Sequence, residues 1–209
     1  MPEARPAALP PAERTVGQLV AESIRFYGSR FWAVLPLGIP FVVVDSLGIG
    51  QSAAVQTVIL WLATPLFCVA LVRASSLVTG AQPTWTAFLA AVLLFLPFPI
   101  LLRLYVLPGV AWVAIFGLAV PAAVAEHLPL GAALRRGRAL SGADLAHALG
   151  GMAALALVYG VSRAFLLILL HTQGNQTQVI ALVLADLVLS PLLFVGTALL
   201  YVDQAARVK

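Results

Sequence analysis

The sequence has little charge and a single cysteine, and both shortages restrict what this chain can be. Only 10% of its 209 residues are Asp, Glu, Lys or Arg, whereas soluble domains usually carry about 25%. Hydrophobic residues make up 62% of the chain and the mean hydropathy is +1.03. These values are typical of a chain that crosses a membrane several times. The one cysteine, Cys68, lies in an apolar run and has no second cysteine with which to form an intrachain disulfide.

The charge that is present belongs to a membrane protein. The formal net charge of +4 comes from basic residues that flank apolar segments. Because this distribution is the positive-inside bias of membrane proteins, we expect no nucleic-acid partner. The first residues are rich in Pro, Ala, Glu and Arg without an apolar core, which predicts a disordered cytoplasmic tail at 1–13 and no cleavable signal peptide.

From Phe31 to Val202 the chain is almost continuously apolar, and a few charged residues divide it into about six segments. A helix of about 20 residues crosses the ~30 Å hydrocarbon core of a bilayer. We therefore predict an all-α integral membrane protein, a single polytopic membrane domain at 14–209. The predicted transmembrane helices are 31–49, 54–72, 85–102, 104–125, 144–170 and 177–202.

Prolines predict where these helices are irregular. The first segment contains Pro36 and Pro40, which should kink it or leave carbonyls free. Three further prolines crowd the boundary between the third and fourth segments, which predicts that this pair is either regular or broken and re-entrant. They are Pro97, Pro99 and Pro108.

Two amphipathic segments, 14–30 and 128–142, are too polar to cross the bilayer. Each places apolar residues on one face and arginines elsewhere, which predicts helices that lie in the membrane interface. For the first, packing on a small cytoplasmic face is the alternative. Thr15 and Gln18 form a predicted capping box, and Ser141 and Asp144 are predicted to cap the fifth transmembrane helix.

The distribution of Lys and Arg predicts the orientation. With the N-terminus in the cytoplasm, ten of the twelve basic residues fall on the cytoplasmic side and only Arg103 lies at an outer end. We therefore expect both termini in the cytoplasm, and the residue composition favours a bacterial inner membrane. The arginines of the two amphipathic segments are candidate contacts for anionic lipid headgroups, with the positive-inside bias alone as the alternative. They are Arg25, Arg30, Arg135, Arg136 and Arg138.

Four charged residues lie in or near the outer half of the predicted bilayer, and they are Asp45, Arg103, Arg163 and Asp186. Charges at this depth are costly and are usually paired or functional. Arg163 and Asp186 fall at similar depths on consecutive helices and should form an ion pair. The four residues are either a solute or ion site or structural pairs that fix helix packing.

Catalytic and metal-binding patterns are weak. Asp144 and His147 are spaced by one helical turn but have no third ligand, and His127 and His171 lie elsewhere in the sequence. The serines have neither a nucleophile-elbow motif nor an assignable base. We therefore expect no metal, no cofactor and no enzymatic activity.

Three stretches resemble one family of bacterial membrane proteins: TVGQLVAESIRFYGSRFWAVLPLGIP (15–40), PAAVAEHLPLGAALRRGRALSG (121–142) and ALLYVDQAAR (198–207). The resemblance is to the membrane domain of some glycerophosphoryl diester phosphodiesterases and its stand-alone relatives. This chain departs from the pattern at Gly137, where a tryptophan or serine often follows the arginine pair. It also lacks the catalytic barrel, which needs about 250 residues, so the resemblance implies a membrane module without the hydrolase.

The sequence therefore favours a non-enzymatic accessory or organising module that contacts membrane lipid, preferentially anionic lipid. Its rival is a small transporter that uses the outer-half charges as a solute or ion site. A water-accessible cavity that reaches Arg163 and Asp186 would favour the transporter. Either could involve an unidentified membrane-protein partner or a homo-oligomer.

Overall fold

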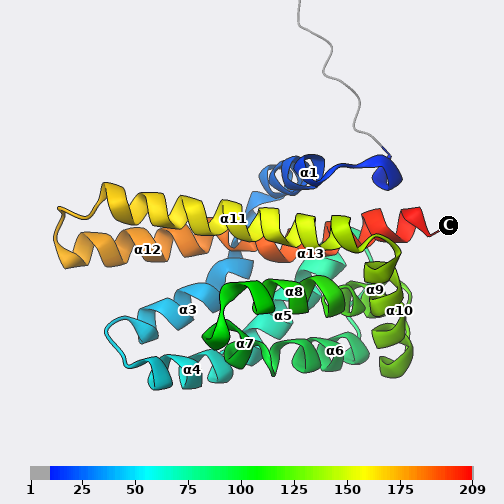
Figure 1. Cartoon of the computed structure of the whole chain (residues 1–209), viewed down its shortest axis with the longest axis horizontal. Coiled ribbons are helices and arrows are strands. Elements are labelled where there is room, and N and C mark those ends of the chain that lie inside the picture. The colour runs from blue at the N-terminus through cyan, green and yellow to red at the C-terminus, as the bar shows by residue number, and fades with distance from the viewer. Residues whose placement is uncertain (1–9, 209) are drawn as a thin grey trace, which may run out of the picture.

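The computed structural model describes residues 10–208, and within that range every element is helical (Figure 1). This confirms the predicted all-α fold. Five helical segments are long and apolar enough to span a membrane, and a sixth is added when one bent pair is counted as a span. The predicted tail falls mostly on residues 1–9, outside the described residues. Pro11–Glu13 form instead a 3-10 turn, η1, which packs on the last helix.

The chain enters the fold through the predicted amphipathic helix α1, Val16–Ser29. The predicted capping box is present at the start of α1. The Thr15 side chain accepts a hydrogen bond from the backbone N–H of Gln18, and the Gln18 side chain accepts one from the backbone N–H of Thr15. The first span follows in three pieces, α2 (Phe31–Val34), the 3-10 turn η2 (Leu35–Gly38) and α3 (Ile39–Gly48). The irregularity predicted at Pro36 and Pro40 is present as this 3-10 interruption of the helix.

The sharpest bend lies in the second span, where no distortion was predicted. Here α4 (Ala53–Leu62) and α5 (Thr64–Thr79) meet at 49°. Pro65 lies in the first turn of α5 and has no N–H to donate to the preceding turn, so the helix breaks there. The helix does not stop at residue 72, where the predicted span ends, since α5 continues through the exposed Arg73 to Thr79. A long arginine can reach the interface from a helix that continues past it.

The third and fourth spans form a helical hairpin rather than a re-entrant pair, and each span consists of two helices separated by a short break. They consist of α6 (Trp85–Phe95), α7 (Phe98–Leu104), α8 (Val106–Phe116) and α9 (Ala119–Ala125). At the α6–α7 break, Trp112 and Trp61 donate their indole N–H groups to the carbonyls of Leu94 and Leu96, at 2.9 and 3.1 Å. The breaks are tolerated in lipid because the freed carbonyls have these donors.

The last four helices are α10 (Leu130–Ala143), α11 (Leu145–Leu169), α12 (Asn175–Leu189) and α13 (Pro191–Arg207). Pro191 divides the sixth span into α12 and α13, which together cover 33 residues. That is longer than the ~20 residues a bilayer needs. Part of this segment therefore extends past the hydrocarbon core.

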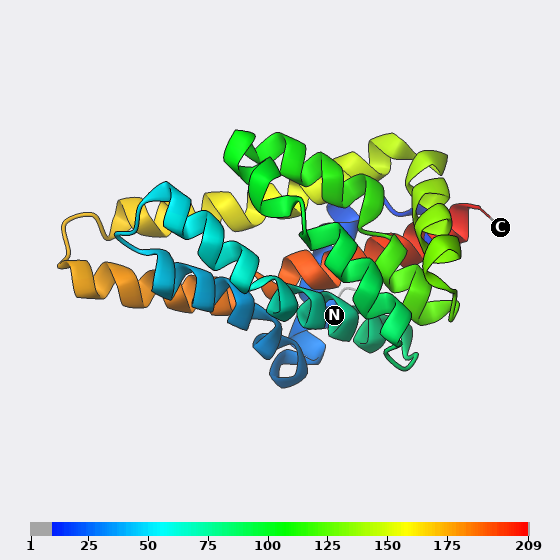
Figure 2. The same cartoon turned by 90° about the horizontal axis from the view of Figure 1, so that it is seen from below.

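The long helices lie side by side, and α10 crosses them at one end. Figures 1 and 2 show α10 across the long axis of the molecule, beside the C-terminal end of α13. α1 is seen almost end-on in Figure 1 and so also lies across this axis. At the opposite end, the α3–α4 and α11–α12 hairpins extend beyond the turn between α7 and α8 in both views.

Candidate functional site: a charge cluster beside an apolar cavity

Three of the four predicted outer-half charges come together between α3, α11 and α12. One Arg163 nitrogen forms an ion pair with Asp45, and the other lies 3.4 Å from Oδ1 of Asp186. The predicted pairing of Arg163 with Asp186 across the fifth and sixth spans is confirmed. Asp45 joins them from the first span, so this arginine connects helices that are far apart in the sequence.

Tyr159 is a fourth member of the cluster and was not predicted from the sequence. Its hydroxyl donates to Oδ1 of Asp186 at 2.6 Å and accepts from Nη1 of Arg163 at 3.0 Å. Tyr159 precedes Arg163 by four residues on α11. Because residues four apart share one face of a helix, this spacing was a usable signal.

The cluster has more acidic than basic groups. It contains two carboxylates and one guanidinium, and the side chains of Asp186, Asp45 and Arg163 are 0%, 19% and 27% exposed. Oδ2 of Asp186 is buried without a hydrogen-bond partner among residues 10–208. Unpaired charge at this depth is expensive, so the arginine is the group on which the burial of both carboxylates depends.

Close helix packing brings the acidic groups to this position. At Gly38 the turn η2 lies so near to α12 that a Cβ would overlap the backbone of Leu187. α3 then continues along α12 and carries Asp45 toward Asp186. The hydroxyl of Ser190 also donates to the Asp186 carbonyl at 2.5 Å, at the break before Pro191.

Arg103 lies outside the cluster, contrary to the prediction that grouped it with the other three. It occupies the last turn of α7, is exposed, and has no ion pair within the described part of the chain. α7 packs against α8 and α4 rather than against α12. The prediction failed because depth in the membrane was inferred from sequence position, whereas the neighbours of α7 are set by tertiary packing.

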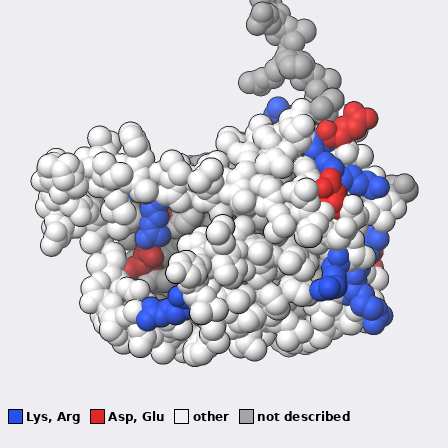
Figure 3. All heavy atoms as spheres, viewed as in Figure 1, with Lys and Arg blue, Asp and Glu red and all other residues white. Residues whose placement is uncertain are grey.

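A cavity of about 390 Å³ lies beside the cluster and has Tyr159 and Arg163 in its wall. The ring of Phe41 also lines the cavity and packs against Tyr159 of the cluster, with 5.3 Å between the two ring centroids. Figure 3 shows basic and acidic side chains together in a hollow between the α11–α12 hairpin and α3. The rest of the wall is almost wholly apolar and includes the side chains of Phe67, Phe95, Phe98, Leu102, Val110, Met152, Leu193 and Phe194.

The predicted lipid-contacting arginines are on α1, α10 and the start of the first span. Arg25 pairs with Glu22 at 2.7 Å, and Arg136 pairs with Glu126 at 3.0 Å. Arg30 donates to the carbonyl of Leu77 at 2.7 Å. Arg135 and Arg138 are exposed, and the guanidinium of Arg138 lies 6.0 Å from the centroid of the Phe116 ring.

A second polar group joins the start of α11 to the end of α13. Arg14 donates to Oδ1 of Asp203 at 2.9 Å, and Arg207 forms an ion pair with Asp144. Asp144 caps α11 as predicted, accepting from the backbone N–H of His147 at 2.9 Å. These contacts tie the segment before α1 to the C-terminal helix.

Ser141 does not cap α11, and that prediction is wrong. Its hydroxyl contacts the carbonyls of Ala114, Ile115 and Gly137 at 2.9, 2.9 and 3.0 Å, which attaches α10 to α8.

Within residues 10–208, no group of three or more His, Cys, Asp or Glu side chains is arranged to hold a metal ion.

The fold and the site define a class. The chain is an all-α, multi-pass membrane protein with a charge cluster in its transmembrane region. No protein-family model, curated protein or solved structure matches it. The resemblance to the phosphodiesterase-associated membrane domain therefore stays a prediction.

Proposed function

We propose that this protein is a non-enzymatic lipid-binding module of the bacterial inner membrane. In this proposal the apolar cavity beside Arg163 holds the hydrocarbon part of a membrane lipid. The arginines predicted from the sequence contact anionic headgroups at the cytoplasmic surface. The module acts as an accessory or organising protein for other membrane components.

The chemistry of the cavity wall carries this proposal. A volume of about 390 Å³ falls within the ~300–1,000 Å³ range of ligand pockets. Water in a buried cavity needs two to four polar partners, and here the polar lining groups are Arg163, Tyr159 and Thr197. Tyr159 and Arg163 bond within the cluster, and Thr197 donates to the Leu193 carbonyl at 2.7 Å. Such a cavity favours hydrocarbon over water or a hydrophilic solute.

The serines give no support to an enzymatic alternative. The hydroxyls of Ser141 and Ser190 both donate to backbone carbonyls. A serine nucleophile instead needs a base within hydrogen-bond reach. Neither hydroxyl is hydrogen-bonded to a histidine among the described residues.

Filling the cavity should remove the bound lipid. Gly160 lines the cavity, and a Cβ at this position would meet no atom within 4 Å. Gly160 is also exposed, so Gly160→Phe should occupy space at the outer edge of the cavity and lower the amount of co-purifying lipid, measured by mass spectrometry of lipid extracted from detergent-purified protein. Val161→Phe is the matched control, because Val161 is the next residue on α11 and is 57% exposed. Equal lipid content in the two variants would contradict the proposal.

A small transporter is the second candidate, favoured by the fact that the cavity reaches Arg163. The two functions differ in what fills the cavity. Gly160→Cys in a Cys68→Ala background gives one thiol in the cavity wall. If lipid fills the cavity, this thiol should react with an apolar maleimide but not with a membrane-impermeant sulfonate reagent. Rapid sulfonate labelling in intact cells would favour the transporter.

Orientation in the membrane can be tested separately. The proposed topology places both termini in the cytoplasm, because ten of the twelve Lys and Arg residues then lie on that side. A reporter fused after residue 209 should be active in the cytoplasm, and one inserted in the 171–176 loop should be active outside it. Cytoplasmic activity of the loop fusion would refute this topology.

A further inference from the structure

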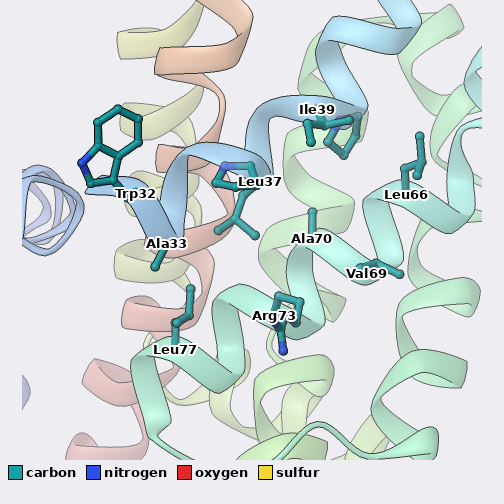
Figure 4. A pocket seen from close by; sticks show the side chains of 11 residues that line it. Trp32, Ala33, Leu37, Ile39, Leu66, Val69, Ala70, Arg73 and Leu77 are labelled. Atoms are coloured by element: carbon teal, nitrogen blue, oxygen red, sulfur yellow. The ribbon is translucent and has the colours of Figure 1, made fainter. Parts of the chain in front are cut away.

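A groove separate from the cavity runs between the first span and α5. Its volume is about 450 Å³. One wall comes from α2, η2 and α3, and the other comes from residues of α5 that lie three or four apart on one face of the helix. Figure 4 shows Ile39 and Leu66 toward one end of the groove and Arg73 and Leu77 toward the other.

The interruption of the first span creates this groove. Pro36 and Pro40 both line it, and the 3-10 turn between α2 and α3 contains the first of them. Proline cannot donate to the preceding turn and displaces the chain there. A regular helix at this position would follow α5 more closely, so the groove results from the same prolines that interrupt the span.

Two arginines without a carboxylate partner mark one end of the groove. Arg73 lines it and is exposed, and Arg30 donates to the carbonyl of Leu77, which lines the groove one turn further along α5. Neither arginine has an ion pair with an acidic side chain in the described range. The remaining lining residues are apolar, so the groove itself is amphipathic.

The geometry points to a binding site for one anionic phospholipid, with its phosphate at Arg73 and Arg30 and an acyl chain along the groove toward Ile39. This inference rests on the proposed lipid-binding function and assigns it a particular site. Arg73 was not among the arginines predicted from the sequence to contact lipid. The site is distinct from the cavity beside Arg163, with which it shares no lining residue.

Charge complementarity and position argue for a lipid as the occupant. Trp32 lines the groove and is 82% exposed, and exposed tryptophans concentrate at the level of lipid headgroups. Arg30 directly follows α1, the helix proposed to lie in the interface. A headgroup at this level would meet both guanidinium groups, while the apolar walls continue into the depth of the bilayer.

The test uses the full chain in detergent, with native mass spectrometry of complexes formed with dioleoyl phosphatidylglycerol or dioleoyl phosphatidylcholine. A basic residue near the membrane surface contributes about 1 kcal/mol to binding anionic lipid. Arg73→Gln should therefore weaken phosphatidylglycerol binding about fivefold, and it should weaken phosphatidylcholine binding less, because the choline cation of that lipid offsets the charge of its phosphate. Arg103→Gln is the matched control, because Arg103 is exposed, does not line the groove and is not among the arginines proposed to contact lipid headgroups. Val69→Trp should obstruct the groove and weaken the binding of both lipids.

The outcomes separate this site from the general proposal. If phosphatidylglycerol binds to the wild type but Arg73→Gln and Arg103→Gln weaken this binding equally, the groove assignment is wrong and the proposed function stands. If the wild type binds neither lipid, both fail. Displacement of phosphatidylglycerol by millimolar glycerol 3-phosphate would identify a soluble phosphate ester as the ligand and overturn the lipid assignment.

Discussion

Replacing Arg163 with leucine should lower the midpoint of thermal unfolding by about 10 °C. Arg163 is the only cation within salt-bridge distance of Asp45 and Asp186 among residues 10–208. Without it, two carboxylates remain side by side, one of them fully buried. Removing one partner of a buried ion pair costs about 3–5 kcal/mol. For a domain of this size, each kcal/mol lowers the midpoint of unfolding by roughly 2–4 °C.

Removing one aspartate should have a much smaller effect. Asp186→Leu leaves the ion pair of Arg163 with Asp45, so no net charge is left behind. Its expected cost is the loss of the charge-assisted hydrogen bond from Tyr159, about 1.5–3 kcal/mol. The double variant Arg163→Leu/Asp186→Leu should be more stable than Arg163→Leu alone, because it also removes the buried carboxylate.

The protein contains its own probe for this measurement. Cys68 is the only cysteine and is 0% exposed, so a thiol-reactive fluorophore should label it only when the chain unfolds. Arg103→Leu is the control, since Arg103 is exposed and has no ion pair in the described part of the chain. Equal unfolding midpoints for Arg163→Leu and Arg103→Leu would show that the cluster contributes nothing to stability.

The sequence predicted this cluster in part because depth in a membrane can be counted along a helix. Arg163 and Asp186 lie on consecutive antiparallel spans joined by a short loop, so equal depth implied contact. Asp45 and Arg103 were predicted to join them because they lie at a similar depth, and of these two only Asp45 contacts Arg163. Which helix lies beside which depends on close approaches such as that of Gly38 to the Leu187 backbone. A count of depth contains no such information.

Helix boundaries show a similar division. The capping box at Thr15 and the irregularity at Pro36 and Pro40 were predicted correctly, because each depends on the local chain alone. The continuation of α5 through Arg73 was not predicted, because an arginine that follows an apolar run resembles the end of a span in the sequence. In the folded chain Arg73 is exposed beside a groove, and its side chain can extend toward the interface while the helix continues.

The cavity and the groove could not be predicted from the sequence. Both are spaces between elements, and their walls combine residues from distant parts of the chain. The sequence did contain one cause of the groove, namely the prolines that interrupt the first span. Apolar residues at helical spacing look the same in a sequence whether they touch another helix or line a space.

The second large effect is expected at Gly137, in the middle of α10. A Cβ at this position would overlap the backbone of Ala119, in α9. Alanine normally stabilises a helix interior by about 0.5–1 kcal/mol relative to glycine. Here overpacking should reverse the sign, and we expect Gly137→Ala to cost about 1–3 kcal/mol.

A larger side chain at this position should detach α10 from the bundle. Gly137→Leu must move α10 away from α9, and Ser141 then loses its contacts with the carbonyls of Ala114 and Ile115. We expect a decrease in the Cys68 unfolding midpoint of about 10 °C, since large overpacking reaches ~3 kcal/mol and the lost hydrogen bond of the Ser141 hydroxyl adds ~1 kcal/mol. Gly142→Leu is the matched control, because it lies in the same helix and a Cβ there would meet no atom within 4 Å. If Gly137→Leu were as stable as Gly142→Leu, α10 would not be held against α9 as described, and its crosswise position at the end of the bundle would lose its physical basis.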